Sequence, residues 1–96
     1  MSPNNKKKLT KLRKSLDKLD NSFIKLIKKR TDLVKQVLKL KENKKEIIDR
    51  KRIRFILKQI RKKSLKNKID PKITNRIWKN MIYSYIDFER RNFKKK

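Results

Sequence analysis

Apolar residues recur every three or four positions from residue 9 onward, which is the spacing of one buried stripe on a long helix. The stripe consists of Leu9, Leu12, Leu16, Leu19, Phe23, Ile27, Val34 and Val37. We expect this helix to run from about Asn5 to about Asn43. A helix of about forty residues spans about 60 Å, whereas a compact domain of this size has a radius of gyration of about 12–13 Å. The helix must therefore protrude, and its apolar stripe needs a partner.

Two further apolar stripes predict two shorter helices. They consist of Ile53, Ile56, Leu57 and Ile60 in the second helix, and of Ile73, Ile77, Trp78, Met81, Ile82, Tyr85, Ile86 and Phe93 in the third. Asp49 is a suitable N-cap for the second helix, which we expect to end near residues 66–68. The third begins at Asp70-Pro71, a cap followed by Pro in the first turn. No segment alternates as a strand would, so we expect an all-α fold of three helices.

Cations lie where the first stripe should be apolar. Arg30 lies between two members of the stripe, Lys41 one turn beyond its last member, and Arg13 in a turn near its start. A cation on a helix seam is unfavourable unless a negative group meets it, which points to an anionic ligand. Arg30 and Lys41 are eleven residues apart and face the same way, but Arg13 lies seventeen residues from Arg30, about 25 Å along the axis. An intertwined antiparallel homodimer, crossing near Phe23 or Ile24, would complete two identical sites.

Composition excludes several kinds of chemistry. The 96 residues, one domain in length, contain no Cys, His or Gly. Disulfides, common zinc sites, a His general base and a Gly-rich phosphate loop are therefore absent, and we expect neither a metal nor a cofactor. No apolar run is long enough to span a membrane, and residues 1–8 lack the core of a signal peptide. We expect a cytoplasmic protein without a membrane partner.

The net charge of +25 favours binding to polyanions through counterion release. Most of this charge is Lys, accompanied by many Asn and Ile and by no Ala, a bias typical of an A/T-rich coding background. We interpret the bulk of it as a solvated face. Basic residues surround every predicted helix and no DNA-binding signature occurs, so nucleic acid is expected to bind only nonspecifically. A non-enzymatic basic helical dimer that binds nucleic acid stays an alternative.

Three segments together resemble the all-helical chorismate mutases. "LTKLRKSLDKLDNSFIKLIKKRTDLVKQVLKLK" is similar to their first helix, including an Arg followed eleven residues later by a Lys. "IIDRKRIRFIL" resembles the segment with Asp-x-x-Arg, and "IDPKITNRIWKNMIYSYIDFE" the final helix. The resemblance implies a polar N-terminal extension (1–8), a chorismate-mutase-like helical domain (9–92) and a basic tail (93–96). It also implies conversion of chorismate to prephenate in aromatic amino-acid biosynthesis.

The resemblance assigns roles residue by residue. Arg13 of the partner subunit and Arg30 would bind the two carboxylates of chorismate, and Lys41 the ether oxygen. The remaining contacts that it implies are Arg52 to a carboxylate, Asp49 to the C4 hydroxyl region, Val37 and Ile82 as apolar walls, and Tyr85 near the substrate. This rearrangement is pericyclic and needs no nucleophile, metal or general base. Folding the substrate into its reactive conformer and donating hydrogen bonds to the ether oxygen are sufficient.

Two positions depart from the family pattern. Ile53 replaces a Glu that usually contacts the C4 hydroxyl. Glu89 replaces the Gln that is usually the second donor to the ether oxygen, although some fungal members also have Glu. A carboxylate cannot donate a hydrogen bond, so Glu89 would act as a catalytic donor beside Lys41 only when protonated.

The related isochorismate–pyruvate lyases are the alternative on the same fold. They share an apolar residue at the position of Ile53 and a Tyr at that of Tyr85. They lack the acid corresponding to Asp49 and keep Gln where Glu89 stands, so we favour the mutase. A 4-amino analogue of chorismate as substrate, or an inactive family member, also stays open.

Overall fold

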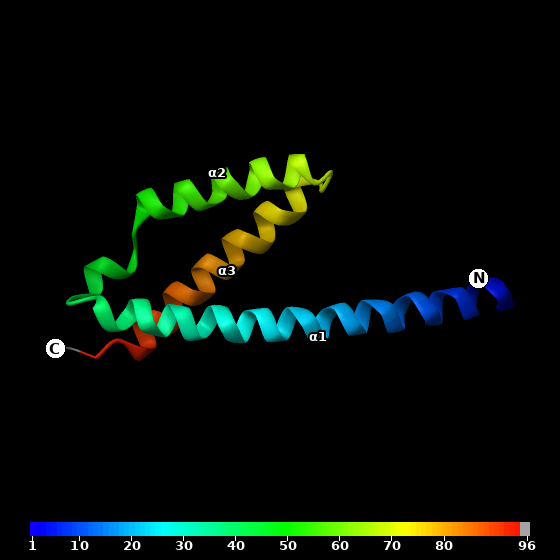
Figure 1. The fold of residues 1–96 in the computed structure, drawn as a ribbon, viewed down its shortest axis with the longest axis horizontal. Helices are drawn as coiled ribbons and strands as arrows, with labels where there is room; N and C mark the ends of the chain where they lie inside the picture. Colours follow the sequence, from blue (N-terminus) through cyan, green and yellow to red (C-terminus); the bar gives the residue numbers. More distant parts are fainter. Residues whose placement is uncertain (95–96) are drawn as a thin grey trace. The chain divides into compact units, whose positions relative to one another are not determined.

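The structure is a computed structural model that describes residues 1–94. It contains α1 (Pro3–Leu40), the 3-10 helix η1 (Lys44–Ile47), α2 (Arg50–Lys66) and α3 (Pro71–Asn92) (Figure 1). No strand occurs in this part of the chain, so the prediction of an all-α fold with three helices is confirmed. None of the helices formed by residues 1–94 has the length and apolar character needed to cross a bilayer. The chain divides into two units, residues 1–33 and residues 34 onward, and α1 runs through the boundary.

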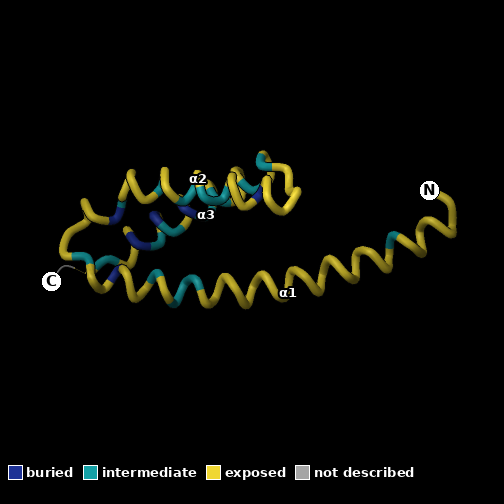
Figure 2. Tube along the Cα trace, turned by 45° about the horizontal axis from the view of Figure 1, so that its top comes forward, coloured by how far each residue is buried: buried dark blue, intermediate teal, exposed yellow. Residues whose placement is uncertain are grey.

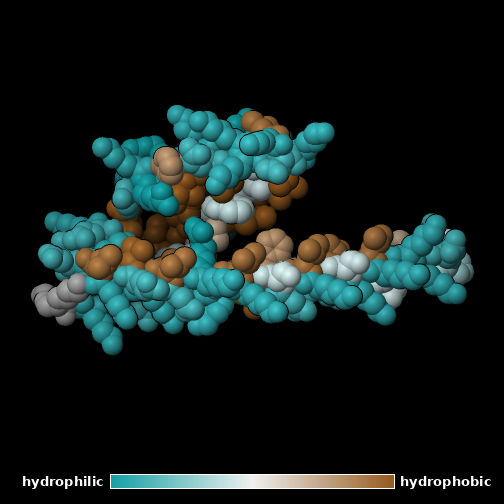
Figure 3. Space-filling view, in the orientation of Figure 1, coloured by the Kyte–Doolittle hydropathy of each residue, from teal (hydrophilic) through white to brown (hydrophobic). Residues whose placement is uncertain are grey.

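The first unit comprises residues 1–33, which are the first two residues and most of α1. The Ser2 hydroxyl accepts a hydrogen bond from the Asn5 N–H at 3.2 Å and Pro3 occupies the first helical position, which together explain the start of the helix. Almost every residue of this unit is exposed (Figure 2). Its apolar stripe forms a row of exposed side chains along α1 (Figure 3), including Leu12, Leu16, Leu19 and Phe23. The long first helix is confirmed, and its stripe is uncovered within the unit.

The first helix ends at Leu40, three residues before the predicted end. Lys41 therefore follows the helix, and its N–H bonds the Leu38 carbonyl at 3.1 Å in a tighter turn. The expectation that Lys41 belongs to the helix is wrong. The following η1 turn was not predicted; Asn43 caps it with its side chain, and Ile47 anchors it with only 3% of its surface exposed.

The core of the second unit gathers one side chain from α1, one from η1 and two from α3. These are Leu38, Ile47, Ile82 and Ile86. Ile53, Ile56 and Leu57 of α2 pack against them, as does Phe93. Part of the predicted apolar faces of α2 and α3 is thus buried around the end of α1. Ile73 and Ile77, predicted members of the third stripe, are exposed.

Local polar chemistry fixes the ends of α2 and α3. Asp49 Oδ1 accepts the Arg52 N–H at 2.9 Å, and Asp70 Oδ1 accepts the Lys72 N–H at 2.9 Å. Both predicted N-caps are confirmed. Between the two helices the buried Ser64 hydroxyl lies 2.6 Å from the Thr74 hydroxyl, so a polar contact also joins them.

A turn without glycine connects α2 to α3 (Figure 1). The Ile69 N–H bonds the Ser64 carbonyl at 2.9 Å and the Lys68 N–H bonds the Leu65 carbonyl at 3.2 Å. This pair of bonds is a Schellman motif, whose C′ position is left-handed and usually Gly. Here Lys68 adopts that conformation, with φ 57°, at a cost of roughly 1 kcal/mol relative to Gly.

Candidate active site

A buried ion pair joins the end of α1 to the last turns of α3. Lys41 Nζ lies 2.9 Å from Glu89 Oε1. The side chain of Lys41 is 16% exposed and that of Glu89 is 7% exposed, so both charges are largely withdrawn from water. Removing two charges from water is favourable only when they are paired and their remaining hydrogen-bonding capacity is used. Because such a pair adds little to stability by itself, Lys41 and Glu89 form a candidate functional site.

Different local features of the chain bring Glu89 and Lys41 to this point. Glu89 follows Ile82 and Ile86 at helical spacing, so the apolar stripe of α3 carries its carboxylate inward. Lys41 reaches the same point because the tight turn after Leu40 redirects the chain. The predicted pair of catalytic residues is thus in direct contact.

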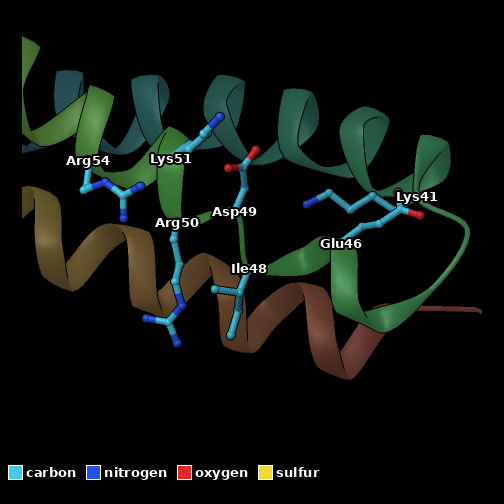
Figure 4. Close-up of a pocket in the computed structure, with 7 residues that line it drawn as sticks. All are labelled: Lys41, Glu46, Ile48, Asp49, Arg50, Lys51 and Arg54. Atoms are coloured by element: carbon cyan, nitrogen blue, oxygen red, sulfur yellow. The ribbon is translucent and has the colours of Figure 1, made fainter.

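Lys41 also lines an open pocket of about 680 Å³ (Figure 4). The other residues that line it are Glu46, Ile48, Asp49, Arg50, Lys51 and Arg54. They come from η1, from the segment after it and from the first turns of α2 (Figure 4). Four cations face two carboxylates in this lining, so the pocket favours an anionic ligand.

Asp49 has two roles at this pocket. Its Oδ1 atom caps α2 through the Arg52 N–H, and the residue lines the pocket beside Lys41. Its Oδ2 atom makes no hydrogen bond within residues 1–94 and is therefore available to a ligand. The predicted contact between Asp49 and a hydroxyl group is compatible with this geometry.

Sequence reasoning did not identify Arg50, Lys51 and Arg54 as pocket residues. Arg50 and Arg54 are four residues apart, so they lie on one face of α2. These residues could have been predicted, because the first turn of a helix that Asp49 caps lies beside the ligand that Asp49 is predicted to contact. What the sequence could not give was the path of the chain between Lys41 and Asp49.

Arg30 and Arg13 belong to the first unit. Arg30 is half-buried, and its Nε atom is buried without a hydrogen-bond partner among the described residues. Buried polar atoms are almost always paired, so this atom is an unsatisfied donor. Arg13 is exposed, and within the described chain it forms no ion pair with Asp17 or Asp20. The structure does not join either arginine to Lys41, and their roles stay predictions.

The remaining predicted contacts lie in three different environments. Arg52 is exposed, with its guanidinium carbon 5.4 Å from the centre of the Phe55 ring. Ile82 is buried in the core of the second unit, and Tyr85 is half-buried. Val37 is 49% exposed. Among the described residues, none of these four lines the pocket beside Lys41.

The family model of chorismate mutase type II matches residues 12–90. This match covers most of the chain, and the protein belongs to the type II chorismate mutase family. The resemblance inferred from the three sequence segments is thereby confirmed. The family supports an isomerase that acts on chorismate, at the level of the family. Neither a curated protein nor a solved structure matches the chain.

Proposed function

We propose that the protein converts chorismate to prephenate at a site centred on Lys41 and Glu89. The observation that carries the proposal is their buried contact of 2.9 Å beside a cationic pocket, in a chain of this family. Chorismate has two carboxylates and an ether oxygen that gains negative charge as its bond to carbon breaks. A site with positive donors aimed at that oxygen stabilises the transition state more than the substrate.

Lys41 is the proposed principal donor to the ether oxygen. An ammonium group has three N–H donors, and one of them is used by Glu89. Two donors are then available for the ether oxygen and a neighbouring carboxylate. The contact with Glu89 restricts the flexible Lys41 chain, so part of its ordering entropy is lost before substrate binds.

Glu89 is the proposed second donor, in its protonated form. Its Oε1 atom accepts a hydrogen bond from Lys41, which leaves Oε2 to carry a proton toward the ether oxygen. In this form the site would resemble the usual arrangement of a Lys and a Gln amide. The proposal therefore requires that Glu89 be protonated when chorismate binds, whereas in the ion pair it is a carboxylate.

The carboxylates would be bound by arginines from both subunits of an antiparallel homodimer. The exposed stripe of α1 supports this assembly, because so continuous an apolar row is uncommon on a monomer. The unsatisfied Nε of Arg30 supports a carboxylate ligand there. Arg13 of the partner subunit would supply the second contact. Arg52 would have to leave Phe55 to take part.

Incubation of the purified protein with chorismate, followed by chromatographic detection of prephenate, tests the proposal. Lys41→Met should reduce kcat/KM by about 100- to 1000-fold, since it removes a donor to the developing charge. Lys35→Met, which alters an exposed lysine of α1, is the matched control and should retain activity. Arg30→Ala should mainly raise KM. Absence of prephenate from the wild-type reaction, or equal activity of the Lys41 and Lys35 variants, would contradict the proposal.

A parallel reaction with isochorismate separates the mutase from the lyase. The lyase would release salicylate and pyruvate instead of prephenate. The mutase is favoured because Asp49, the acid that lyases lack, lines the pocket. Chorismate conversion without pyruvate release is the expected result.

A further inference from the structure

The outer face of α2 carries a dense and unbalanced positive charge. Within its 17 residues α2 contains no Asp or Glu, whereas α1 and α3 contain both signs of charge. Its exposed cations are Arg50, Lys51, Arg52, Arg54, Lys58, Arg61, Lys62, Lys63 and Lys66. The helix spans about 25 Å, so one positive charge occurs about every 3 Å. One strand of duplex DNA carries a negative charge about every 3.4 Å, so the charge density of α2 is comparable with that of a nucleic acid.

The other face of α2 is occupied. Ile53, Ile56 and Leu57 pack against the core of the second unit. Most of the cations therefore lie away from that core, in contrast to the even distribution expected from the sequence, while Arg50, Lys51 and Arg54 also line the pocket beside Lys41. A basic helix that binds a membrane must insert its apolar face among the lipids, and this face is unavailable. Charge density without a free apolar face favours a hydrophilic polyanion.

An exposed aromatic ring lies among these cations. Phe55 is 53% exposed, and the guanidinium of Arg52 lies over its ring at 5.4 Å from the centroid. Three lysines border the ring on the helix surface because they lie at helical spacing from Phe55. Lys51 precedes it by four residues, and Lys58 and Lys62 follow it by three and seven. Proteins that bind single strands combine a cationic track for phosphates with aromatic rings on which bases stack.

We propose that the outer face of α2 binds single-stranded nucleic acid. Lys58, Lys62 and Lys66 form a row at four-residue spacing that contacts successive phosphates, and Phe55 stacks on a base. Duplexes are bound more weakly, because their bases are already stacked and cannot reach the ring. This activity is distinct from the proposed enzymatic one, since Phe55, Lys58, Lys62 and Lys66 are not among the residues that line the pocket beside Lys41.

A fluorescent oligothymidylate of about 16 nucleotides is the probe, and its anisotropy is measured against protein concentration at several salt concentrations. The triple variant Lys58→Glu/Lys62→Glu/Lys66→Glu should bind more weakly. It should also reduce the slope of log K against log salt by about 2, because three phosphate contacts are lost. The charge-matched control is Lys11→Glu/Lys14→Glu/Lys18→Glu on α1, all exposed, which should keep most of the slope.

Phe55→Ala tests the stacking contact separately from charge. It should weaken binding about tenfold with an unchanged salt slope, because no charge is altered. Tyr83→Ala, which removes an exposed ring of α3, should bind as the wild type does. Circular dichroism of all variants verifies that they keep their helices.

Four results would overturn the proposal. The first two are an equal loss of oligonucleotide affinity in the two triple variants and identical binding by the Phe55 and Tyr83 variants. The third is duplex binding as tight as single-strand binding. The fourth is binding to vesicles of phosphatidylcholine and phosphatidylserine without binding to the oligonucleotide. The chorismate assay is run on the same samples. Because the oligonucleotide is measured directly, failure of either activity leaves the other result interpretable.

Discussion

Lys41 and Glu89 are 48 positions apart in the chain, and their charged atoms lie 2.9 Å apart in a largely buried pair. Each residue limits what the other can do. Lys41 is ordered by the carboxylate, and Glu89 can donate a hydrogen bond only by acquiring a proton. The catalytic proposal and its dependence on pH both follow from this single contact.

Glu89→Gln should flatten the dependence of activity on pH. The wild-type carboxyl group donates a hydrogen bond only while it carries a proton, whereas Gln keeps an N–H donor at every pH. The rate of chorismate conversion from acid to mildly alkaline pH measures this. Asp87→Asn, which changes an exposed acid of α3 paired with Arg91, should leave the profile unchanged. A wild-type profile already flat over this range would remove the donor role of Glu89.

Breaking the ion pair from one side should destabilise the fold. Lys41→Met leaves the Glu89 carboxylate buried without its partner, so the free energy of unfolding should fall by about 3 kcal/mol near neutral pH. Urea denaturation measures the change. The double variant Lys41→Met/Glu89→Leu should recover most of that loss, because no unpaired charge is left. A double variant as unstable as the single one would show that packing, and not the unpaired charge, causes the effect.

Subunit complementation tests whether Arg13 acts across an interface. At a chorismate concentration far below the KM of either variant, Arg13→Ala and Arg30→Ala should each be nearly inactive alone. If the two variants are unfolded and refolded as an equimolar mixture, half of the dimers are mixed and each contains one intact site. The mixture should then regain about a quarter of wild-type activity. Activity no higher than that of the separate variants would place both arginines in one subunit's site or in neither.

The apolar stripe of α1 should control assembly. Phe23→Glu introduces a charge at the centre of the exposed row, and should convert a dimer into monomers in sedimentation velocity. Lys25→Glu, an exposed charge change nearby, is the control and should sediment as the wild type. A wild-type protein that is already monomeric at micromolar concentration would contradict the dimer.

Lys68→Gly should stabilise the protein by about 0.5–1 kcal/mol. Gly adopts the left-handed conformation of this turn without the strain that Lys68 incurs. Chemical denaturation measures the gain. Lys62→Gly, in the interior of α2, should instead destabilise by about 1 kcal/mol. If both changes destabilise equally, the conformation of the turn makes no contribution.

Local chemistry made much of the fold predictable. The caps at Asp49 and Asp70 act within three residues of themselves, so sequence alone located the starts of α2 and α3. Glu89 was identified only through the family resemblance, and its burial beside Ile82 and Ile86 is a finding of the structure. The end of α1 was misplaced because the tight turn at Lys41 depends on burial of Leu38 and Ile47, which are brought together by tertiary packing. The pocket contribution of α2 was missed for the same reason.

Because Asp49 both caps α2 and lines the pocket beside Lys41, its proposed contact with substrate and the start of the helix depend on one side chain. Replacement by Ala would remove about 1 kcal/mol of helix stability along with the charge. Asn keeps the capping oxygen and discards only the charge. Variants that probe the proposed substrate contact should therefore begin with small capping residues at position 49, the changes that the fold tolerates best.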